Sequence, residues 1–449
     1  MGIKLIAIPL IVGILIIPII NSSGAVKGVT HEDNIINLTK NDKIFPINHR
    51  VAVSESNVFV VWADIAAPAL NNSNYDNQDI FFTKSTDTGS SFGKIINLSN
   101  NSGNSNIPQI SAVGANVYVV WLDDFSGNQD IFFKKSTDGG NSFGKIIDLS
   151  RNNNENTDNN THSSFNPQLA VSGNSVYVVW QEDDATTGNQ DIFFKKSTDG
   201  GNSFGPVNNL SRTDGDSLAP QIALSSGIER GGEGGNNSTN IYLVWTDCVP
   251  KIVSDEPLCD ILFTKSKDNG NSFDGIINLS NNTGASFDPQ ISMSTDEGEG
   301  GSKSSNTLYV TWQDDSFTSS GNYDIFFTKS TDGGNSFEST ENLSKTNGTS
   351  RFQKMATPSQ SNVFLTWADV NDANNLPSQT FDILFKKSTD GGNSFGKIID
   401  LSRNNNENTD NNTHSSFNPQ LAVSGNNVYV VWQEDDAITG NQDIFFKKS

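Results

Sequence analysis

The sequence predicts an all-β protein, a seven-bladed β-propeller of four-stranded blades, and three observations support this prediction. Each repeated unit contains β-branched and aromatic runs separated by Gly, Asn and Asp, the pattern of short strands joined by turns. The first and last parts of the chain contain complementary pieces of one unit. Tryptophan occurs seven times, always at the same place in the unit: Trp62, Trp121, Trp180, Trp245, Trp312, Trp367 and Trp432.

Four strands are predicted in each unit. In the third copy the first three strands are Pro167–Val171, Val176–Trp180 and Asp191–Lys195. The fourth is Lys145–Leu149 in the second copy and Lys94–Leu98 in the first. The second strand is apolar on both faces in several copies, which is typical of a strand buried inside a layered structure.

The last copy contains its third strand, around Ile444–Phe446, and the sequence stops at Ser449. Asn34–Thr39 is a surplus fourth strand that precedes the first unit. We expect this N-terminal strand to pair with the last third strand and close the propeller, which would remove an exposed sheet edge. The alternative is a chain that is cut short, or a fragment of a longer repeat array.

Two long segments, 133–197 and 385–449, are the same except at Ser175/Asn427 and Thr186/Ile438. Such close identity indicates a recent duplication of the unit. A catalytic residue is usually needed once, so we do not expect position-specific chemistry in either copy.

The chain carries 29 basic and 51 acidic residues and a net charge of −22, which argues against nucleic acid and anionic membranes as partners.

Residues 1–25 are predicted to be a signal peptide, with one basic residue, an apolar run and small residues at a possible cleavage site. An uncleaved N-terminal anchor is the alternative, and it would be the one contact with a membrane. Residues 26–449 then form a single propeller domain, secreted or held at the cell surface. Sequons such as Asn97-Leu98-Ser99 and Asn342-Leu343-Ser344 fit an exported glycoprotein.

Cys248 and Cys259 are the two cysteines of the chain, and they flank a loop that the other copies lack. In an exported protein such a pair is expected to form a disulfide. Two cysteines without a nearby histidine do not make a zinc site.

After each complete third strand the chain repeats one turn, of which Ser136-Thr137-Asp138-Gly139-Gly140-Asn141-Ser142-Phe143 is an example. This turn resembles the Asp box, or BNR repeat, of the sialidase superfamily, and six copies in register cover nearly the whole chain after residue 25. The Asp carboxylate can accept backbone hydrogen bonds and the Gly can adopt positive φ. The resemblance implies a structural role, on the face away from an active site, for Asp87, Asp138, Asp199, Asp268, Asp332 and Asp390.

The resemblance also implies a catalytic set: three arginines on the sialic acid carboxylate, a Tyr–Glu nucleophile and an Asp acid/base. Arg50 lies where the family carries its Phe/Tyr-Arg-Ile-Pro motif, but that motif is missing. Five of the seven tyrosines occupy core positions of the second strand, and Tyr323 follows in a loop without an obvious Glu partner. We therefore predict a non-enzymatic binding or scaffold module for a glycan or protein. The alternative is an exo-sialidase-like glycoside hydrolase.

An acidic residue follows each Trp by two positions, and an Asp precedes each third strand, so two carboxylates flank the same hairpin loop. The two carboxylates of each pair repel one another, and Asn-rich turns and screening by solvent are expected to offset this repulsion. A bound Ca²⁺ ion is the alternative, and no other cofactor is expected. The variable loops at this end are the predicted binding region. Arg50 and Lys354 replace a recurring Gln there, and they are the candidate ligand-binding residues for an anionic or sugar ligand, with a polar lining as the alternative.

Overall fold

The computed structural model is built from antiparallel β-sheets joined by turns and loops, and its described residues contain no helix. The residues that the structure describes therefore contain no helix with the length and hydrophobicity needed to cross a membrane. The described residues are 47–65, 78–87, 89–150, 162–183, 188–225, 238–249, 258–294, 306–316, 322–346, 348–370, 380–402, 415–424, 427–435 and 442–448. The predicted signal segment and the predicted N-terminal strand Asn34–Thr39 lie outside them.

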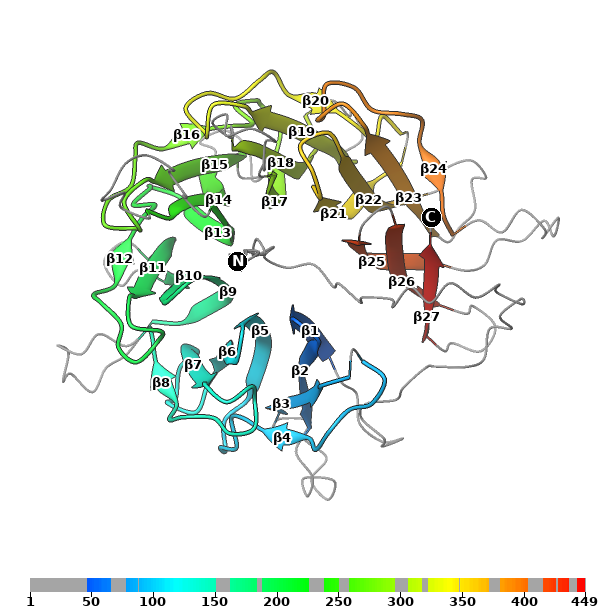
Figure 1. The fold of residues 1–449 in the computed structure, drawn as a ribbon. Helices are drawn as coiled ribbons and strands as arrows, with labels where there is room; N and C mark the ends of the chain where they lie inside the picture. The colour runs from blue at the N-terminus through cyan, green and yellow to red at the C-terminus, as the bar shows by residue number, and fades with distance from the viewer. Residues whose placement is uncertain are drawn as a thin grey trace, which may run out of the picture. The chain divides into compact units, whose positions relative to one another are not determined.

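In the described part of the chain, six sheets have four strands and one has three, and within each sheet the strands follow chain order (Figure 1). Sheet 1 contains β1 (Ile47–Ser54), β2 (Asn57–Ile65), β3 (Gln78–Ser85) and β4 (Ile96–Asn97). Sheet 2 contains β5 (Ser105–Val113), β6 (Asn116–Asp123), β7 (Asp130–Ser136) and β8 (Ile147–Asp148). Sheet 3 contains β9 (Ser164–Ser172), β10 (Ser175–Asp183), β11 (Gln190–Ser197) and β12 (Asn208–Asn209).

The remaining sheets repeat this order. Sheet 4 contains β13 (Asp216–Ser225), β14 (Asn240–Val249), β15 (Leu258–Ser266) and β16 (Ile277–Asn278). Sheet 5 contains β17 (Ser286–Ser294), β18 (Thr307–Asp314), β19 (Asp324–Ser330) and β20 (Glu341–Asn342). Sheet 6 contains β21 (Ser350–Ala356), β22 (Val363–Val370), β23 (Phe381–Ser388) and β24 (Ile399–Asp400). Sheet 7 contains β25 (Ser415–Ser424), β26 (Asn427–Asp435) and β27 (Gln442–Lys448).

The fold thus confirms the predicted four-strand unit in six sheets, but the fourth strand was predicted too long. It pairs over two residues only, as Ile96 and Asn97 do with Phe82 and Phe81. The chain then leaves the sheet, because the next residues, Leu98 and Ser99, bond back to the start of the third strand: Leu98 N donates to Ile80 O at 2.7 Å, and Ile80 N donates to Ser99 Oγ at 2.9 Å.

The sheets group into two compact units, residues 47–185 with 194–208 and residues 186–193 with 209–448. Within the first, β5 of sheet 2 packs against β1, β2 and β3 of sheet 1. Within the second, β17 packs in the same way against sheet 4, and β21 packs against sheet 5. Within each unit, a sheet therefore covers the face of the sheet before it, which is how blades of a propeller bury their surfaces.

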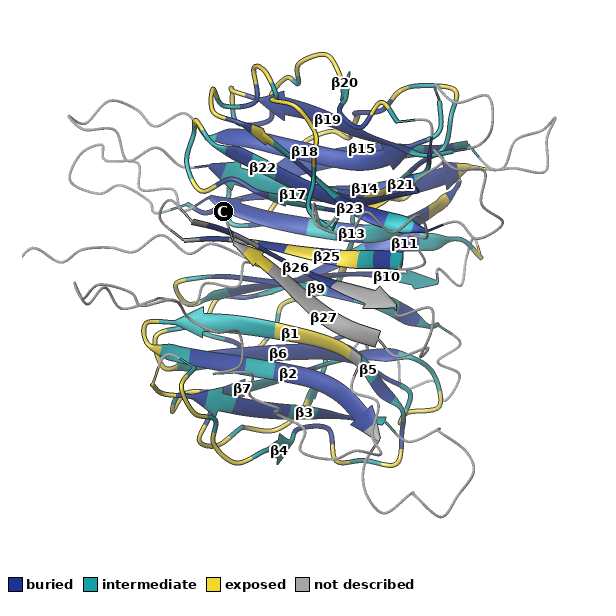
Figure 2. Ribbon diagram, turned by 90° about the vertical axis from the view of Figure 1, so that its right-hand side faces the viewer, coloured by how far each residue is buried: buried dark blue, intermediate teal, exposed yellow. Residues whose placement is uncertain are grey.

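The second strand of each sheet forms the middle of the core, as the burial view shows for β6, β14 and β18 (Figure 2). Trp121 and Tyr118 of β6 are buried and stack on Phe132 and Phe133 of β7, with ring centroids 6.1 and 6.3 Å apart. The predicted core role of the tyrosines is confirmed for Tyr118, Tyr177, Tyr242 and Tyr309.

The predicted Asp-box turns of sheets 2, 3, 5 and 6 are each attached to the sheet before their own. Phe143 of the second turn packs edge-on against Phe82 of sheet 1, with ring centroids 4.9 Å apart. Lys84 Nζ of sheet 1 donates to Gly139 O at 2.6 Å and to Asn141 Oδ1 at 2.7 Å. Gly140 has φ +76°, and a Cβ there would lie 2.6 Å from Phe82 Cζ, so glycine is required both for the turn and for the neighbour.

Candidate functional site

The first strand of every sheet begins with a β-bulge. The register shifts at this point, and the residue at the bulge has positive φ although it is never glycine. Bulges re-aim the side chains beside them and often occur near functional sites. The seven bulge residues are Asn48, Ile107, Asn166, Ala219, Asp288, Phe352 and Asn418.

The next two residues are Pro and Gln in five of the sheets. Sheet 1 instead has His49 and Arg50, and sheet 6 has Gln353 and Lys354, so the two sheets depart from the repeat at both positions. Arg50 and Lys354 belong to different units, and the predicted role of the pair as ligand-binding residues stays a prediction.

Arg50 is exposed at the start of β1. Its Nε donates to Gln109 Oε1 of sheet 2 at 3.3 Å, and its Nη1 donates to His49 O at 2.9 Å. Nearby, Asn48 Nδ2 donates to Asn106 Oδ1 at 2.8 Å, and Asn106 Nδ2 donates to Gln78 Oε1 at 3.0 Å. The junction between sheets 1 and 2 is therefore lined by amide side chains.

Lys354 is half-buried on β21, opposite Thr366 of β22. The residue before it, Gln353, is only 2% exposed and ties sheet 6 to sheet 5. Its Nε2 donates to Asp288 O at 2.6 Å, and its Oε1 accepts from Gln313 Nε2 at 3.2 Å. Gln313 Nε2 also donates to Asp288 Oδ2 at 3.0 Å, so both bulges of this junction are held by a buried amide network.

Three residues at the same junction form a cluster that we call the aromatic–arginine cluster: Phe287, Tyr323 and Arg351. The rings of Phe287 and Tyr323 meet edge-on with centroids 5.9 Å apart. The guanidinium of exposed Arg351 lies over the Tyr323 ring, with Cζ 5.1 Å from the centroid, a cation–π contact. Two bonds hold the cluster together: Ser350 N donates to Tyr323 O at 2.7 Å, and Thr349 Oγ1 donates to Asn322 Oδ1 at 3.0 Å.

Sequence reasoning missed this cluster, since it placed Tyr323 in a loop without a partner and did not single out Arg351. The signal was available by alignment of the repeats. Tyr323 directly precedes the Asp that begins a third strand, and sheets 1, 2 and 3 carry Gln at this position. Arg351 directly follows the Ser that pairs with the acidic residue of a second strand, and sheet 2 carries Asn106 at this position. Beside the cluster Phe352 is 40% exposed, so an aromatic ring and a cation are presented together.

The acidic pairs predicted from the sequence do face one another: Asp123 pairs with Asp130, and Asp314 pairs with Asp324. The prediction that solvent screens them is wrong, because Asp123 is 0% exposed and Asp130 is 2% exposed. Asp123 Oδ2 accepts from Trp121 Nε1 at 3.0 Å, Ser105 Oγ at 2.6 Å and Asn101 Nδ2 at 2.8 Å. Asp130 Oδ1 accepts from Ser150 Oγ at 3.0 Å. Buried donors, rather than water, offset the repulsion.

Two donor sets recur from sheet to sheet. The Trp indole also donates to the acidic residue two positions later in four other sheets, and the acceptors are Asp64, Glu182, Asp314 and Asp369. The Ser that follows the fourth strand bonds to the Asp of the third strand in Asp79, Asp191, Asp260, Asp324 and Asp382. Burial raises the pKa of Glu182, Asp247 and Asp369.

The turns that resemble Asp boxes lie at the opposite end of the strands. In the first of them Asp87 accepts from Ser85 Oγ at 2.6 Å, Ser91 N at 2.9 Å and Ser91 Oγ at 2.6 Å. These bonds lower the pKa of Asp87 to about 2. The same pattern surrounds Asp138, Asp199, Asp268, Asp332 and Asp390. Every carboxylate of this set thus serves the shape of its own turn.

The predicted disulfide is present: Cys248 and Cys259 are a cross-strand pair of β14 and β15, with Cα atoms 4.0 Å apart. Cys259 occupies the position of Gln78 and Tyr323, directly before the Asp of the third strand. In sheet 4 a covalent bond therefore lies where other sheets present an amide or an aromatic side chain.

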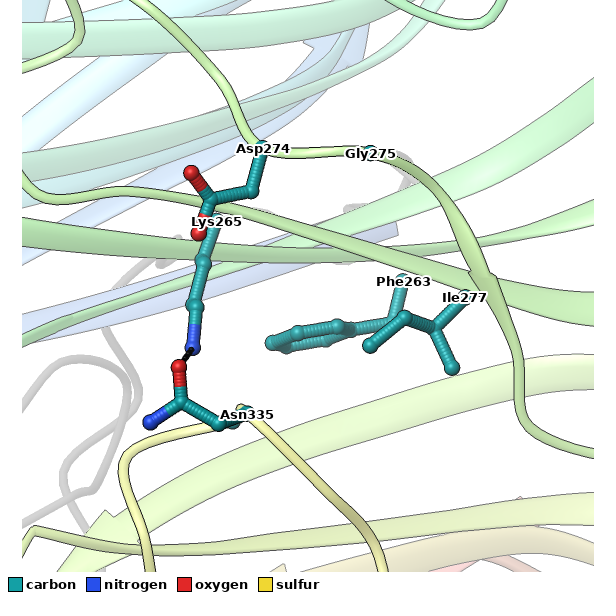
Figure 3. A pocket seen from close by; sticks show the side chains of 7 residues that line it. Phe263, Lys265, Asp274, Gly275, Ile277 and Asn335 are labelled. Atoms are coloured by element: carbon teal, nitrogen blue, oxygen red, sulfur yellow. Dashed lines mark hydrogen bonds between the residues drawn. The ribbon is translucent and has the colours of Figure 1, made fainter.

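Figure 3 shows a small pocket of about 100 Å³ between Phe263, Lys265 and Asn335, with Asp274 and Ile277 at its edge. It lies where the turn of sheet 5 meets sheet 4, and Lys265 Nζ donates to Asn335 Oδ1 across it at 2.7 Å. Other sheets repeat this Lys–Asn contact, so the pocket belongs to the packing of the sheets. Among the described residues, no group of three or more His, Cys, Asp or Glu side chains is placed to hold a metal ion.

No protein-family model matches the chain, and no curated protein sequence matches it. Solved structures do resemble it. A polysaccharide lyase described as PL25 ulvan lyase has a TM-score of 0.50 and 10% identity, covering 88% of this chain and 90% of that chain. The GH93 α-L-arabinofuranosidase of Fusarium graminearum has a TM-score of 0.44 and 12% identity, covering 80% and 93%. The leech intramolecular trans-sialidase has a TM-score of 0.40 and 13% identity, covering 94% and 70%.

At these identities the similarity concerns the fold. Stacked four-stranded antiparallel sheets are the architecture of β-propeller blades, and the similarity to the ulvan lyase extends over most of both chains. The chain is thus an all-β protein with a propeller-type fold, as the sequence predicted.

Proposed function

We propose that this protein binds acidic glycans, and that the aromatic–arginine cluster at the junction of sheets 5 and 6 is the binding site. The observation that carries the proposal is the guanidinium of Arg351 lying over Tyr323, with exposed Phe352 beside it. Sugar rings present C–H faces that pack on aromatic rings, and an arginine fork binds a carboxylate or sulfate through two parallel hydrogen bonds.

The neighbourhood offers a second cation and polar groups. Lys354 lies on the same strand as Arg351, and the side-chain amide of Gln353 lies between them in the sequence. The buried Gln313–Gln353 network holds both bulges in place, which reduces the entropy lost when a ligand binds. Arg50 remains a candidate for a separate contact, at the junction of sheets 1 and 2.

The test is a glycan array followed by calorimetric titration of the best ligand. We expect uronate-containing or sulfated glycans to bind, and Arg351→Ala to weaken binding at least about tenfold, since a hydrogen bond to a charged group contributes about 1.5–3 kcal/mol. Asn106→Ala, at the equivalent position between sheets 1 and 2, is the matched control and should bind normally. Equal binding of acidic and neutral glycans would contradict the proposal, as would full affinity of the Arg351 variant.

A glycan-cleaving enzyme is the second candidate, and the similarity in fold to a polysaccharide lyase favours it over a scaffold for proteins. Tyr323 would be the proton-transfer group in such an activity, since a tyrosine can act as general acid or base. The ligand found on the array should then be incubated with wild type and Tyr323→Phe. A product with an ultraviolet-absorbing double bond would indicate a lyase, and new reducing ends without such a double bond would indicate a hydrolase of the predicted sialidase-like kind. If the glycan stays intact after long incubation, the protein binds glycans without cleaving them.

The proposal includes a closed seven-bladed propeller outside the cell. Its support is a sequence match: Ile35-Ile36-Asn37-Leu38-Thr39 repeats the Ile-Ile-Asn-Leu-Ser that contains the fourth strands β4 and β16. Added to β27, this segment would complete sheet 7. Deletion of residues 26–40 should lower the melting temperature, and an unchanged melt would rule the closure out.

A further inference from the structure

The described chain contains two kinds of Asn-x-Ser/Thr sequon. One is the recurring Asn-Leu-Ser at the fourth strand, at Asn97, Asn209, Asn278 and Asn342. The other is Asn-Asn-Ser or Asn-Asn-Thr three residues later, at Asn100 and Asn281. The two follow one another directly on the connectors that lead from sheet 1 to sheet 2 and from sheet 4 to sheet 5.

The Asn-Leu-Ser sequons are engaged in the fold. Asn97 Nδ2 donates to Asp79 Oδ2 at 2.7 Å, and the hydroxyl of Ser99, which is 3% exposed, donates to Asp79 Oδ1 at 2.6 Å. Asn342 and Ser344 make the same two bonds to Asp324, at 2.7 and 2.6 Å. A glycan on either amide nitrogen would replace one of its two N–H hydrogens and place a sugar beside a buried carboxylate. These sequons are therefore explained by the structure of the sheet, and the prediction of a glycoprotein cannot rest on them.

The second sequon has the opposite geometry. Asn100 is exposed, and its backbone N–H donates to Asn97 Oδ1 at 2.9 Å while its φ of 45° turns the residue outward. Ser102 is exposed as well. The inward position of the turn is taken by Asn101, which bonds to the buried Asp123, so neither end of the sequon is needed for packing.

Asn281 repeats this arrangement in the other unit. Its N–H donates to Asn278 Oδ1 at 2.8 Å, its φ is 41°, and both Asn281 and Thr283 are exposed. Asn282 bonds to the buried Asp314 at 2.7 Å, as Asn101 does to Asp123. Two independent connectors thus present an asparagine amide and a hydroxyl to solvent at sequon spacing.

We propose that Asn100 and Asn281 are N-glycosylation sites and that the adjacent Asn97 and the equivalent Asn342 are not. The donor class is an oligosaccharide on a lipid diphosphate. The amide nitrogen attacks the anomeric carbon, the new C–N bond replaces the C–O bond to phosphate, the lipid diphosphate leaves, and the amide releases one proton. This proposal is independent of the glycan-binding site.

The experiment treats the folded, full-length chain with an oligosaccharyltransferase and a lipid diphosphate oligosaccharide, followed by mass spectrometry of the peptides. A synthetic peptide of residues 95–104 serves as the unfolded reference, in which both sequons are free. We expect the peptide to be modified at either asparagine, and the folded chain, among the six sequons of the described residues, at Asn100 and Asn281 only. Asn100→Gln should remove the first modification, and Ser102→Ala, which leaves the asparagine in place, should remove it as well.

Two results would overturn the proposal. One is modification of Asn97 or Asn342 in the folded chain. The other is a folded chain left unmodified at Asn100 and Asn281 under conditions that modify the reference peptide. Circular dichroism of each variant keeps a loss of folding separate from a loss of the acceptor.

Discussion

At the start of β5, Asn106 meets Gln78 of the preceding sheet through a 3.0 Å hydrogen bond, whereas at the start of β21 the equivalent Arg351 lies over the ring of Tyr323. The two junctions otherwise share their construction. Each has a bulge with positive φ, at Ile107 and at Phe352, and each rests on a Ser that donates to a buried acid.

The difference lies in the side chains that a constant backbone presents. Sheet 4 offers a third version, because Cys259 stands where Gln78 and Tyr323 stand and is bonded to Cys248. One position of the repeat thus carries an amide, an aromatic ring or a disulfide without change in the strand register. Function in this chain can therefore be sought by asking where the repeat departs from itself.

The largest loss of stability should come from removing the buried acidic residue that both junctions contain. Asp123→Ala and Asp369→Ala each leave at least three donors without their acceptor, and an unsatisfied buried donor costs about 1–3 kcal/mol. We expect both variants to lose at least about 3 kcal/mol of unfolding free energy in urea titrations. A loss confined to one of them would show that the junctions are not equivalent.

The disulfide of sheet 4 should come next in size. Its removal by Cys248→Ala with Cys259→Ala should lower the unfolding free energy by about 2–3 kcal/mol, since the closed loop is short. Calorimetry of the oxidised and reduced wild type provides the control, because reduction should produce the same loss. Two alkylatable thiols in the untreated protein would refute the bond itself.

The exchange of side chains between junctions tests the chemistry directly. Gln78→Tyr combined with Asn106→Arg should create a second site and raise the number of ligands bound in titration of an acidic glycan. The gain should disappear in Gln78→Tyr alone, which lacks the cation. Unchanged stoichiometry in a folded double variant would mean that the wider surroundings of Arg351, and not the pair, make the site.

The smallest effect concerns pH. Burial raises the pKa of Asp369, so the folded state holds its proton more tightly than the unfolded state, and stability falls as pH rises from about 4 through the folded pKa. Asp369→Asn should flatten this part of the profile. Asp87 has the opposite sign: with its pKa at about 2, it stabilises the fold above about pH 4 and loses that contribution as pH falls toward 2. Urea midpoints of Asp369→Asn and Asp87→Asn, measured across both pH ranges, would contradict this account if the two variants changed the same limb of the profile.

The repeat and its strands could be predicted because the Trp positions and the Gly-Asn-Asp turns are local signals. The bulges could not, since Ile107, Ala219 and Phe352 are residues that seldom adopt positive φ. The burial of the acidic pairs also escaped prediction, because their donors come from three segments, as Asn101, Ser105 and Trp121 do for Asp123. The cluster required the packing of sheet 6 on sheet 5 to bring Arg351 to Tyr323.

The duplicated segments have a consequence for how the chain reaches its native state. Lys195 donates to Leu149 O, and Lys447 donates to Leu401 O, both at 2.9 Å, so the two copies make the same contact in different units. β11 and β27 also carry the same sequence along their paired lengths. During refolding either strand can pair with β10 or β26, and nothing local distinguishes the correct partner. The correct partner must therefore be selected by contacts that form later. We expect this chain to refold more slowly than a chain whose copies differ in sequence. The amount of misassembled product should increase as temperature and concentration rise.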